Sequence, residues 1–303
     1  MPKFKMRKEL LDLINNTIIY KYDLPHTGLT IDKTIFSTCN DKCYEVTSQA
    51  DLSKIIYNSI IEYSFNEFEL NATDYNDLLE IAFQERIRFN EDDSDVVQLK
   101  YGFFGEVVLF AILKVIYGVD SLISKGYFYS PIENSEAKGY DSYHLVESDS
   151  KIQLWFGETK FHKSYTQAIN DVLGKISTSL SDAYLRKNLL AIRQNKDRLN
   201  IVGSTMETIL DAWAKNPKIV IIDELTKHNI ELIYPIFILF EGKKAGYDES
   251  IKAIPKYIQE NYTAPTFGLS IPYTLYFILM PVSDVKAVKT EVLSWIKSRK
   301  QLL

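Results

Sequence analysis

The segment 105–117 is apolar at nearly every position, and it constrains what this chain can fold into more than any other stretch. A helix that is apolar on most of its sides must be buried, so other elements must surround it. The chain has the material for this, because 46% of its 303 residues are hydrophobic and it contains 20 Tyr and 16 Phe. The sequence therefore predicts a protein with a large core and excludes extensive disorder.

The segments after this helix alternate between strand-like and helical patterns. Strand candidates are the apolar or β-branched segments 126–129, 140–146, 152–160, 219–222, 236–240 and 273–280. Helical spacing is present at 167–193, and 285–296 has the pattern of a closing amphipathic helix. The order of helix, three strands, helix and strand predicts an α/β fold.

The first third of the chain has a different pattern. A short amphipathic stretch at 10–14 and a β-branched run at 17–20 are followed by helical spacing from 51 to 89. The acidic cluster at 91–95 is typical of a loop. We therefore expect a boundary there, between an N-terminal helical and mixed subdomain (1–95) and a larger domain with a C-terminal elaboration (96–303).

Composition excludes several classes of protein. The net charge of −5 argues against a polycation of the histone type, and no uninterrupted apolar run reaches the roughly 18 residues that cross a bilayer. Acidic and amide residues interrupt the stretch after the basic start, so no signal peptide is expected. Cys39 and Cys43 are too few for a disulfide framework or a structural zinc site. We therefore expect a cytoplasmic protein without a membrane anchor.

Four charged residues are candidates for chemistry because they fall where the pattern predicts the interior. Glu106 opens the buried helix, Asp141 lies at a strand, and Glu158 and Lys160 end the strand 152–160. Buried carboxylates are costly unless they are paired or bind a metal. Side chains two residues apart on a strand point the same way, so Glu158 and Lys160 share a face. A neighbouring strand can place Asp141 beside them.

Two carboxylates on adjacent strands, with a lysine two residues on, suit the hydrolysis of a phosphodiester. Open sets of oxygen ligands bind Mg2+ or Mn2+, and such a metal lowers the pKa of a bound water from about 15.7 toward neutrality. Asp141 and Glu158 are the expected metal ligands, and Lys160 can orient the water or stabilise the transition state. Glu106 could hold that water or complete a second metal position.

An acid two residues before a lysine is not specific by itself, because the chain has such pairs at Glu136, Asp149, Glu158, Glu241 and Asp284. The main alternative is Glu241 with Lys243, which follows the apolar run 236–240, with Asp223 ending the strand candidate before it. This alternative lacks an acid on a buried preceding helix, and 242–244 has the composition of an exposed turn. The set around Glu158 is therefore favoured.

Charge is distributed unevenly along the chain. From Glu62 to Lys100 there are 11 acidic and 3 basic residues, whereas from Lys160 to Arg198 there are 8 basic and 3 acidic residues. A solvated helix face is one explanation for each stretch. The other is that the acidic stretch faces a partner, since it would repel DNA, and that the basic stretch tracks a phosphate backbone. The expected DNA contacts are Lys163, Lys175, Arg186 and Lys187.

The four candidate residues and their context resemble the PD-(D/E)xK nuclease superfamily, with Tyr140 in place of the proline. More closely, Gly105-Glu106, Lys138-Gly139-x-Asp141 and Gly157-Glu158-Thr159-Lys160 resemble the HamA family, the small subunits of the Hachiman anti-phage defence system. The resemblance is specific over residues 100–175. It implies a restriction-endonuclease-like core, a central mixed sheet flanked by helices, with metal-dependent cleavage of DNA. It also implies a heterodimer with HamB, a superfamily 2 helicase that restrains the nuclease.

Two other functions stay open on the sequence. One is a stand-alone restriction or repair nuclease with the same chemistry and no partner. The other is a catalytically inert nuclease-fold scaffold, against which stands the presence of all four candidate residues. No zinc-finger or helix-turn-helix pattern is visible, so little base-specific recognition is expected.

Overall fold

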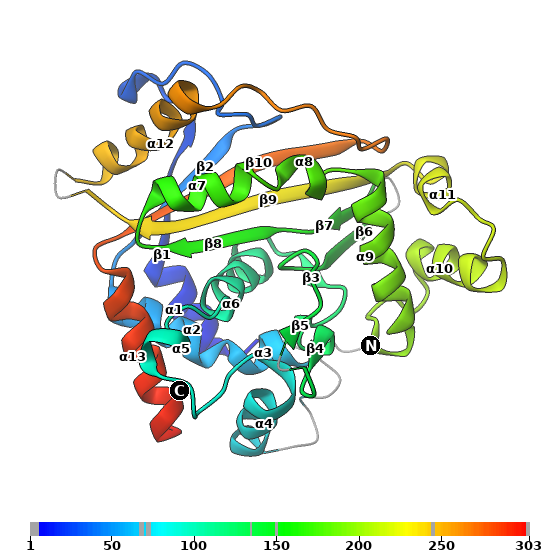
Figure 1. Ribbon diagram of the computed structural model, residues 1–303, viewed down its shortest axis with the longest axis horizontal. Coiled ribbons are helices and arrows are strands. Elements are labelled where there is room, and N and C mark those ends of the chain that lie inside the picture. Colours follow the sequence, from blue (N-terminus) through cyan, green and yellow to red (C-terminus); the bar gives the residue numbers. More distant parts are fainter. Residues whose placement is uncertain are drawn as a thin grey trace.

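The computed structural model describes residues 6–66, 70, 74–133, 135–148, 151–243 and 246–300. Over these residues the chain forms one eight-stranded mixed sheet with helices on both faces, and this confirms the predicted α/β class (Figure 1). The strands follow the order β1-β2-β10-β9-β7-β6-β3, and β8 also pairs with β9.

The centre of the sheet is a pair of long parallel strands, β9 (Ile230–Glu241) and β10 (Tyr273–Val282). Almost every residue in both is buried, as is typical of parallel strands covered on both faces. Beyond β10 lie β2 (Asp41–Val46) and β1 (Ile18–Leu24). On the β9 side lie β8 (Glu158–His162), β7 (Lys151–Trp155), β6 (His144–Ser148) and β3 (Asp120–Ser121). A separate two-stranded sheet pairs β4 (Tyr129–Ser130) with β5 (Ser135–Glu136).

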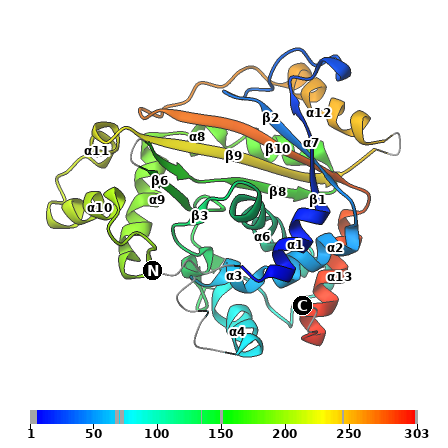
Figure 2. The same ribbon diagram turned by 180° about the vertical axis from the view of Figure 1, so that it is seen from behind.

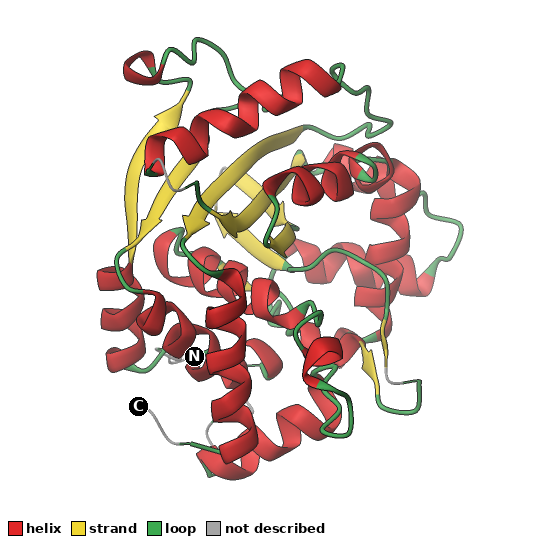
Figure 3. Ribbon diagram, turned by 60° about the vertical axis from the view of Figure 1, so that its left-hand side comes forward, coloured by secondary structure: helices red, strands yellow, loops and turns green. Residues whose placement is uncertain are grey.

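Helices form a layer on each side of the sheet (Figures 1 and 2). The first layer contains α1 (Lys8–Thr17), α2 (Gln49–Asn58), α3 (Ile60–Ser64), α4 (Tyr75–Ile81), α5 (Asp95–Gln98), α6 (Phe103–Ala111) and α13 (Val285–Ser298). The second contains α7 (Tyr165–Leu173), α8 (Ile176–Ser179), α9 (Asp182–Gln194), α10 (Thr205–Lys215), α11 (Ile221–Lys227) and α12 (Tyr247–Asn261). Figure 3 shows the strands between these two layers. Alternate residues of β9 point into the two cores, so the sheet separates them.

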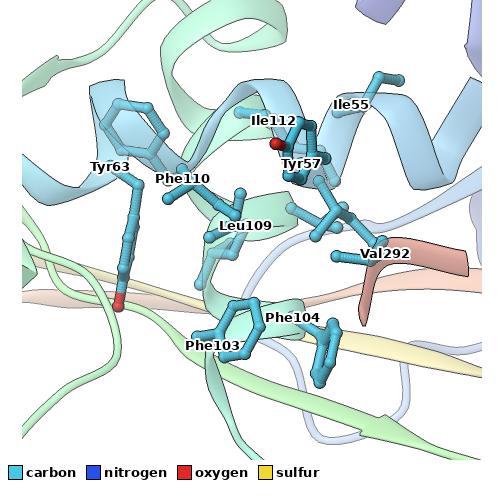
Figure 4. Close-up of a cluster of buried hydrophobic side chains, with 14 of the residues drawn as sticks. Ile55, Tyr57, Tyr63, Phe103, Phe104, Leu109, Phe110, Ile112 and Val292 are labelled. Atoms are coloured by element: carbon cyan, nitrogen blue, oxygen red, sulfur yellow. The ribbon is translucent and has the colours of Figure 1, made fainter. Parts of the chain in front are cut away.

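The predicted buried helix is α6, and a π-helical turn (Ile112–Ile116) continues it. Every residue of α6 is buried, and its apolar side chains lie among those of α2 and α13, such as Ile55 and Val292 (Figure 4). By length and composition the stretch Asp95–Ile116 could cross a membrane, but 72% of its most apolar part is buried inside the protein. That burial is typical of a core helix.

The first layer comes close to the sheet where α6 meets β8 at Gly105. A Cβ atom on Gly105 would lie 2.8 Å from Thr159 Oγ1 and 3.2 Å from the Cβ of Phe161. A larger residue would therefore push the helix away from the strand. The glycine sets how near its neighbour Glu106 comes to β8.

Two predicted strands are not strands of the main sheet. Residues 126–129 form a 3-10 turn (Lys125–Phe128) that leads into the short β4. The apolar run 219–222 leads into α11, which begins at Ile221, because its apolar residues continue at helical spacing to Leu225. A short apolar run does not distinguish a strand from the first turn of a buried helix.

Other predictions hold in outline and differ in detail. The strand predicted at 140–146 begins only at His144, as β6, because its pairing with β7 stops there, so Asp141 lies before this strand and not on it. The helical stretch 167–193 is three helices, α7, α8 and α9, which are separated at Gly174 and Leu180. The strands predicted at 236–240 and 273–280 and the helix at 285–296 are present as β9, β10 and α13.

The expected N-terminal subdomain, residues 1–95, contributes β1 and β2 to the main sheet, where β2 pairs with β10 in parallel. Its helices share one core with α6 and α13. The acidic cluster forms turns that lead directly into α5. A domain boundary at residue 95 stays a prediction.

The close approach at Gly105 predicts a large loss of stability on substitution. Gly105→Val places three carbon atoms where one would already touch Thr159, a stiff β-branched residue that is buried. We expect the free energy of unfolding to fall by about 2 kcal/mol or more, measured by urea denaturation. Gly268→Val is the control, because its nearest neighbour would be 3.9 Å away and its effect should stay within about 0.5 kcal/mol. Equal effects of the two substitutions would contradict the close approach.

A candidate active site at the free edge of strand β8

Strands β7 and β8 lie end to end along β9. Ile152 pairs with Ile230 and Glu158 with Ile236, so both strands keep one register with β9. The predicted strand 152–160 is nevertheless interrupted after Trp155. The interruption lies opposite Pro235 of β9, which has no N–H to donate to the strand beside it.

The chain segment before β6 crosses over this interruption. β6 pairs with β7 only as far as His144 and Trp155. The N–H of Asp141 then donates to the carbonyl of Gly157 at 2.9 Å, and the N–H of Gly157 donates to Ser142 Oγ at 3.0 Å. Beyond Gly157, β9 is the only strand that pairs with β8 among the described residues. The other edge of β8 is therefore open.

Three of the predicted site residues meet at this open edge. Glu158 and Lys160 point to one face of β8, as the two-residue period requires, and they form an ion pair. Their side chains are only 12% and 14% exposed. Asp141 Oδ2 accepts a hydrogen bond from the N–H of Thr159 at 2.8 Å. The Asp141 carboxylate therefore lies against the β8 backbone between Glu158 and Lys160.

The charges of these three residues act on one another. Burial raises the pKa of Glu158 to about 7, with a further contribution from Asp141, and Lys160 only partly opposes it. Burial alone would lower the pKa of Lys160, but Glu158 and Asp141 more than offset this and raise it. The lysine therefore stays charged at neutral pH, and negative charge is in excess around Glu158.

Glu106 reaches the site from the opposite face of the sheet. It lies on α6 and is 7% exposed, and the hydroxyl of Tyr63 on α3 donates a hydrogen bond to its Oε2. Thr159 of β8 points toward this same side, against Gly105 of α6. Strand β8 thus separates Glu106 from Glu158 and Lys160. Side chains on the two faces of β8 can line one cleft only because this edge of the strand is not covered by another strand.

That space is a cleft of about 640 Å3 along the free edge of β8. Its walls come from the segment between α5 and α6, from α6, from β8 and α7, and from α13. Besides Glu106, Asp141 and Lys160, its charged lining residues are Lys100, His162, Lys163, Asp171, Lys286 and Lys289. The cleft therefore joins three of the four predicted catalytic residues, all except Glu158, to a wall rich in lysine.

Several of these residues were not found from the sequence. Tyr63, Lys100 and Lys286 carry no pattern that points to the site. Lys289 does carry one, because it lies at helical spacing from Val285 and Val292 and so falls on the apolar face of the predicted helix. A lysine on such a face is a signal for a buried charge.

The predicted DNA contacts take different positions. Lys163 lines the cleft with its side chain 80% exposed, and its Nζ is 4.0 Å from Glu241 Oε1. Lys175 is exposed between α7 and α8, where its charge acts on Glu158. Arg186 and Lys187 are exposed on α9 and are not among the residues that line the cleft. All four stay predictions as DNA contacts.

His162 ends β8 at the mouth of the cleft. Its Nε2 is 3.4 Å from Asp171 Oδ2 on α7. Burial lowers the pKa of His162, although Asp171 opposes this. The histidine is therefore mainly neutral at pH 7.

The alternative site does not assemble as the sequence suggested. Asp223 lies in the first turn of α11 and not at the end of a strand. Glu241 ends β9, but with Asp223 on a helix the expected pair of strand ends is absent. Of the other acid-x-Lys pairs, Asp149 and the side chain of Glu136 fall outside the described residues.

The carboxylates fit a divalent cation at Asp141 and Glu158. Within the described part of the chain, no three His, Cys, Asp or Glu side chains form a group that could hold a metal, so Glu106 does not complete a three-carboxylate cluster. Mg2+ is often bound by only one or two carboxylates, with waters and substrate phosphates completing its shell. Burial of Glu158, and after it the charge of Asp141, raise the pKa of Glu158, and such a cation would stabilise both ionised carboxylates.

The hydrogen bond between Asp141 and Thr159 predicts different stabilities for two substitutions. Asp141→Ala leaves the N–H of Thr159, a residue only 7% exposed, without its acceptor, whereas Asp141→Asn keeps a carbonyl oxygen there. Both remove the repulsion with Glu158. We therefore expect the alanine variant to be less stable than the asparagine variant by about 1–3 kcal/mol in urea denaturation. Equal stabilities would show that this hydrogen bond does not hold the open edge.

The comparisons with known proteins agree with the motifs. No curated protein and no solved structure matches the chain. The family model HamA matches residues 12–296, which includes both helical layers, all strands of the main sheet and the cleft. The chain therefore belongs to the HamA family, of the Hachiman anti-phage defence system.

Proposed function

We propose that this chain is a metal-dependent DNA endonuclease, the effector subunit of an anti-phage complex, restrained by a helicase partner. The observation that carries this proposal is the meeting of Asp141, Glu158 and Lys160 at the open edge of β8, where Asp141 and Lys160 line a cleft with a lysine-rich wall. An acid in the segment before one strand, Asp141 before β6, and an acid-x-Lys motif on β8 correspond to the PD-(D/E)xK pattern. We therefore assign the fold to that superfamily.

Asp141 and Glu158 are the proposed ligands of Mg2+ or Mn2+. When bound, the metal ion would activate a water and neutralise charge on the phosphate. The part of the protein is to hold the two carboxylates in place. Asp141 is fixed by the backbone N–H of Thr159, and Glu158 is fixed by its ion pair with Lys160.

Lys160 is proposed to stabilise the charge that develops on the phosphate. Its Nζ donates to the carbonyl of Thr159 at 2.9 Å and contacts Glu158, so the ammonium is held in one position before substrate arrives. Its raised pKa keeps it protonated at neutral pH. Lys160 is therefore suited to electrostatic stabilisation and to orienting a water, and not to acting as a general base.

The lysines around the cleft are proposed to bind the DNA backbone. Lys100, Lys163 and Lys286 are exposed on three different walls, so they can follow a strand through the cleft. Contacts of this kind recognise the charge of the DNA backbone and not the base sequence, and they weaken steeply as the salt concentration rises.

The proposed helicase partner rests on membership of the HamA family, because the resemblance to that family implies a helicase subunit beside it. The acidic stretch that we assigned to the partner is partly neutralised within the chain. Lys297 pairs with Asp95 at 2.6 Å, Arg299 pairs with Glu91 at 2.5 Å and also with Glu80, and Arg7 pairs with Glu62 at 3.1 Å. Among the described residues of this stretch, the exposed acids outside these ion pairs are Asp74, Asp77, Glu85 and Asp92, and we place the partner surface on them. Both cysteines are free thiols, which suits the proposed cytoplasmic setting.

The proposed activity predicts loss of cleavage when the catalytic pair is neutralised. Glu158 and Lys160 must be changed together, because removing one would leave the other as an unpaired buried charge. The double variant Glu158→Gln with Lys160→Met should fold and should cleave plasmid DNA at least about a hundredfold more slowly in Mg2+. EDTA should abolish cleavage by the unchanged protein.

The matched control is the double variant Glu241→Gln with Lys243→Met, at the alternative acid-x-Lys pair. It should cleave at the parental rate. Loss of cleavage in this control alone would move the active site to the end of β9. If the unchanged protein, purified away from its helicase, cleaves no DNA with Mg2+ or Mn2+, the chain is an inert scaffold. Adding the helicase subunit tests the restraint, because cleavage should fall on complex formation.

Glu106 is predicted to support the chemistry and not only the start of α6. An acid in the first turn of a helix is favoured by the helix dipole, which is the alternative explanation. Glu106→Gln keeps the shape and can still accept from Tyr63, so the fold should be retained. We expect cleavage to slow by about tenfold or more, with a raised Mg2+ requirement in a metal titration. Parental cleavage at low Mg2+ would show that Glu106 only caps the helix.

A further inference from the structure

Lys289 is a buried cation in the wall of the cleft. It lies on α13, is 8% exposed, and lines the same cleft as Glu106, Asp141 and Lys160. Its Nζ donates to the carbonyl of Phe161 at 3.0 Å and to that of Leu99 at 3.2 Å. The ammonium therefore joins three walls of the cleft: α13, strand β8 and the segment between α5 and α6.

No anionic group in the described part of the chain neutralises this ammonium. Among the described residues, no carboxylate forms an ion pair with Lys289, and its remaining neighbours are the ring faces of Phe161 and Phe104, at 4.7 and 5.3 Å. Burial lowers the pKa of Lys289 to about 8, with no opposing carboxylate. An ammonium in such a place costs free energy that a residue such as Met would avoid.

The open side of Lys289 faces the cleft. Two carbonyls take up two of its three N–H donors, and Phe161, which accepts one of these bonds, follows Lys160 directly on β8. Lys160 itself is neutralised by Glu158, whereas Lys289 is not neutralised by any described group. The cleft thus presents one paired and one unpaired buried cation on either side of one strand edge.

We propose that Lys289 binds a backbone phosphate of the DNA strand, next to the phosphate that is cleaved at Asp141, Glu158 and Lys160. This inference rests on the proposed function for its ligand, and it adds a substrate-binding residue on the C-terminal helix. The ammonium, held by two carbonyls, gives its third donor to the phosphate, and the phosphate supplies the negative charge that the protein lacks at this position. Binding the neighbouring phosphate would fix the register of the strand over β8.

The alternative is that Lys289 only joins the walls of the cleft through its two hydrogen bonds. Lys289→Gln separates the two explanations, because glutamine keeps N–H donors for the carbonyls and has no charge. Lys289→Arg keeps the charge. Lys286→Gln is the matched control, because Lys286 lies one turn earlier on α13, lines the same cleft and is exposed.

The experiment measures binding of a short fluorescein-labelled oligothymidylate by anisotropy, in EDTA and over a range of salt concentrations. Each variant is first checked for its fold by circular dichroism and thermal unfolding. We expect Lys289→Gln to bind about tenfold more weakly or worse, with a salt slope smaller by about one. Lys289→Arg should bind within a few-fold of the unchanged protein, and Lys286→Gln should lose less than Lys289→Gln.

The proposal is overturned if Lys289→Gln folds and binds like the unchanged protein, or loses no more affinity than Lys286→Gln. EDTA keeps this result independent of the proposed function. If the protein binds the oligonucleotide through Lys289 but never cleaves DNA, the nuclease assignment fails and the phosphate site stands. If it cleaves DNA and Lys289→Gln binds normally, the phosphate site fails and the nuclease assignment stands.

If Lys289→Gln fails to fold, the pH dependence of oligonucleotide binding by the unchanged protein tests the proposal instead. Its affinity should fall several-fold as the pH rises through about 8, where Lys289 loses its proton and thus its attraction for phosphate. Lys160 has a raised pKa and His162 a lowered one, so neither changes charge in this range. Glu158, with a pKa of about 7, loses its proton at the lower end of the range, so the decrease in affinity between pH 8 and pH 9 is the part that belongs to Lys289. The other ionisable groups that line the cleft are Lys100, Tyr101, Glu106, Asp141, Lys163, Asp171 and Lys286. Affinity that is constant from pH 7 to about pH 9 would overturn the proposal.

Discussion

The open edge of β8 depends on one interruption in an otherwise continuous sheet. Pro235 offers no N–H to its neighbour, and Gly157 fits there because a Cβ would lie 2.9 Å from Leu109 and 3.2 Å from the carbonyl of Pro235. The β6–β7 hairpin therefore ends at this point and leaves β8 paired on one side only. Exposed strand edges invite unwanted pairing, and charged side chains are a usual protection. Here Asp141, Lys160 and Lys289 bind the N–H of Thr159 and the carbonyls of Thr159 and Phe161.

An open edge also brings together residues that a complete sheet would keep apart. Glu158 and Lys160 point to one face of β8, and Thr159 and Phe161 point to the other, toward α6. Within a closed sheet these faces belong to separate cores, as they do along β9. At the edge, one cleft is lined from both faces, so that Glu106 and Lys289 from the first helical layer share a space with Lys160 and Asp171. The geometry of the candidate site thus depends on where strand pairing stops.

The sequence predicted those parts of this arrangement in which apolar or charged residues repeat regularly along a strand or a helix. Continuous apolar runs predicted β9, β10 and α6, and the two-residue period placed Glu158 and Lys160 on one face. The interruption at Gly157 was missed, because it arises from Pro235 on a strand that is distant in the sequence. The strand predicted at 219–222 was wrong, because a short apolar run fits the first turn of a buried helix equally well. Contacts such as Tyr63 with Glu106 depend on packing between layers and leave no periodic signal.

The charges of the cleft are a cost to the fold that only a ligand offsets. Burial and Asp141 raise the pKa of Glu158, and burial lowers that of Lys289, so each group resists its charge in the free protein. A bound cation at Asp141 and Glu158 would remove the first cost, and a phosphate at Lys289 would remove the second. Each ligand would therefore bind the folded state alone and stabilise it in proportion to the logarithm of its concentration above the dissociation constant. The two sites lie on either side of one strand edge, so a cation at the first site and a phosphate of a DNA strand that crosses β8 at the second could occupy the cleft together.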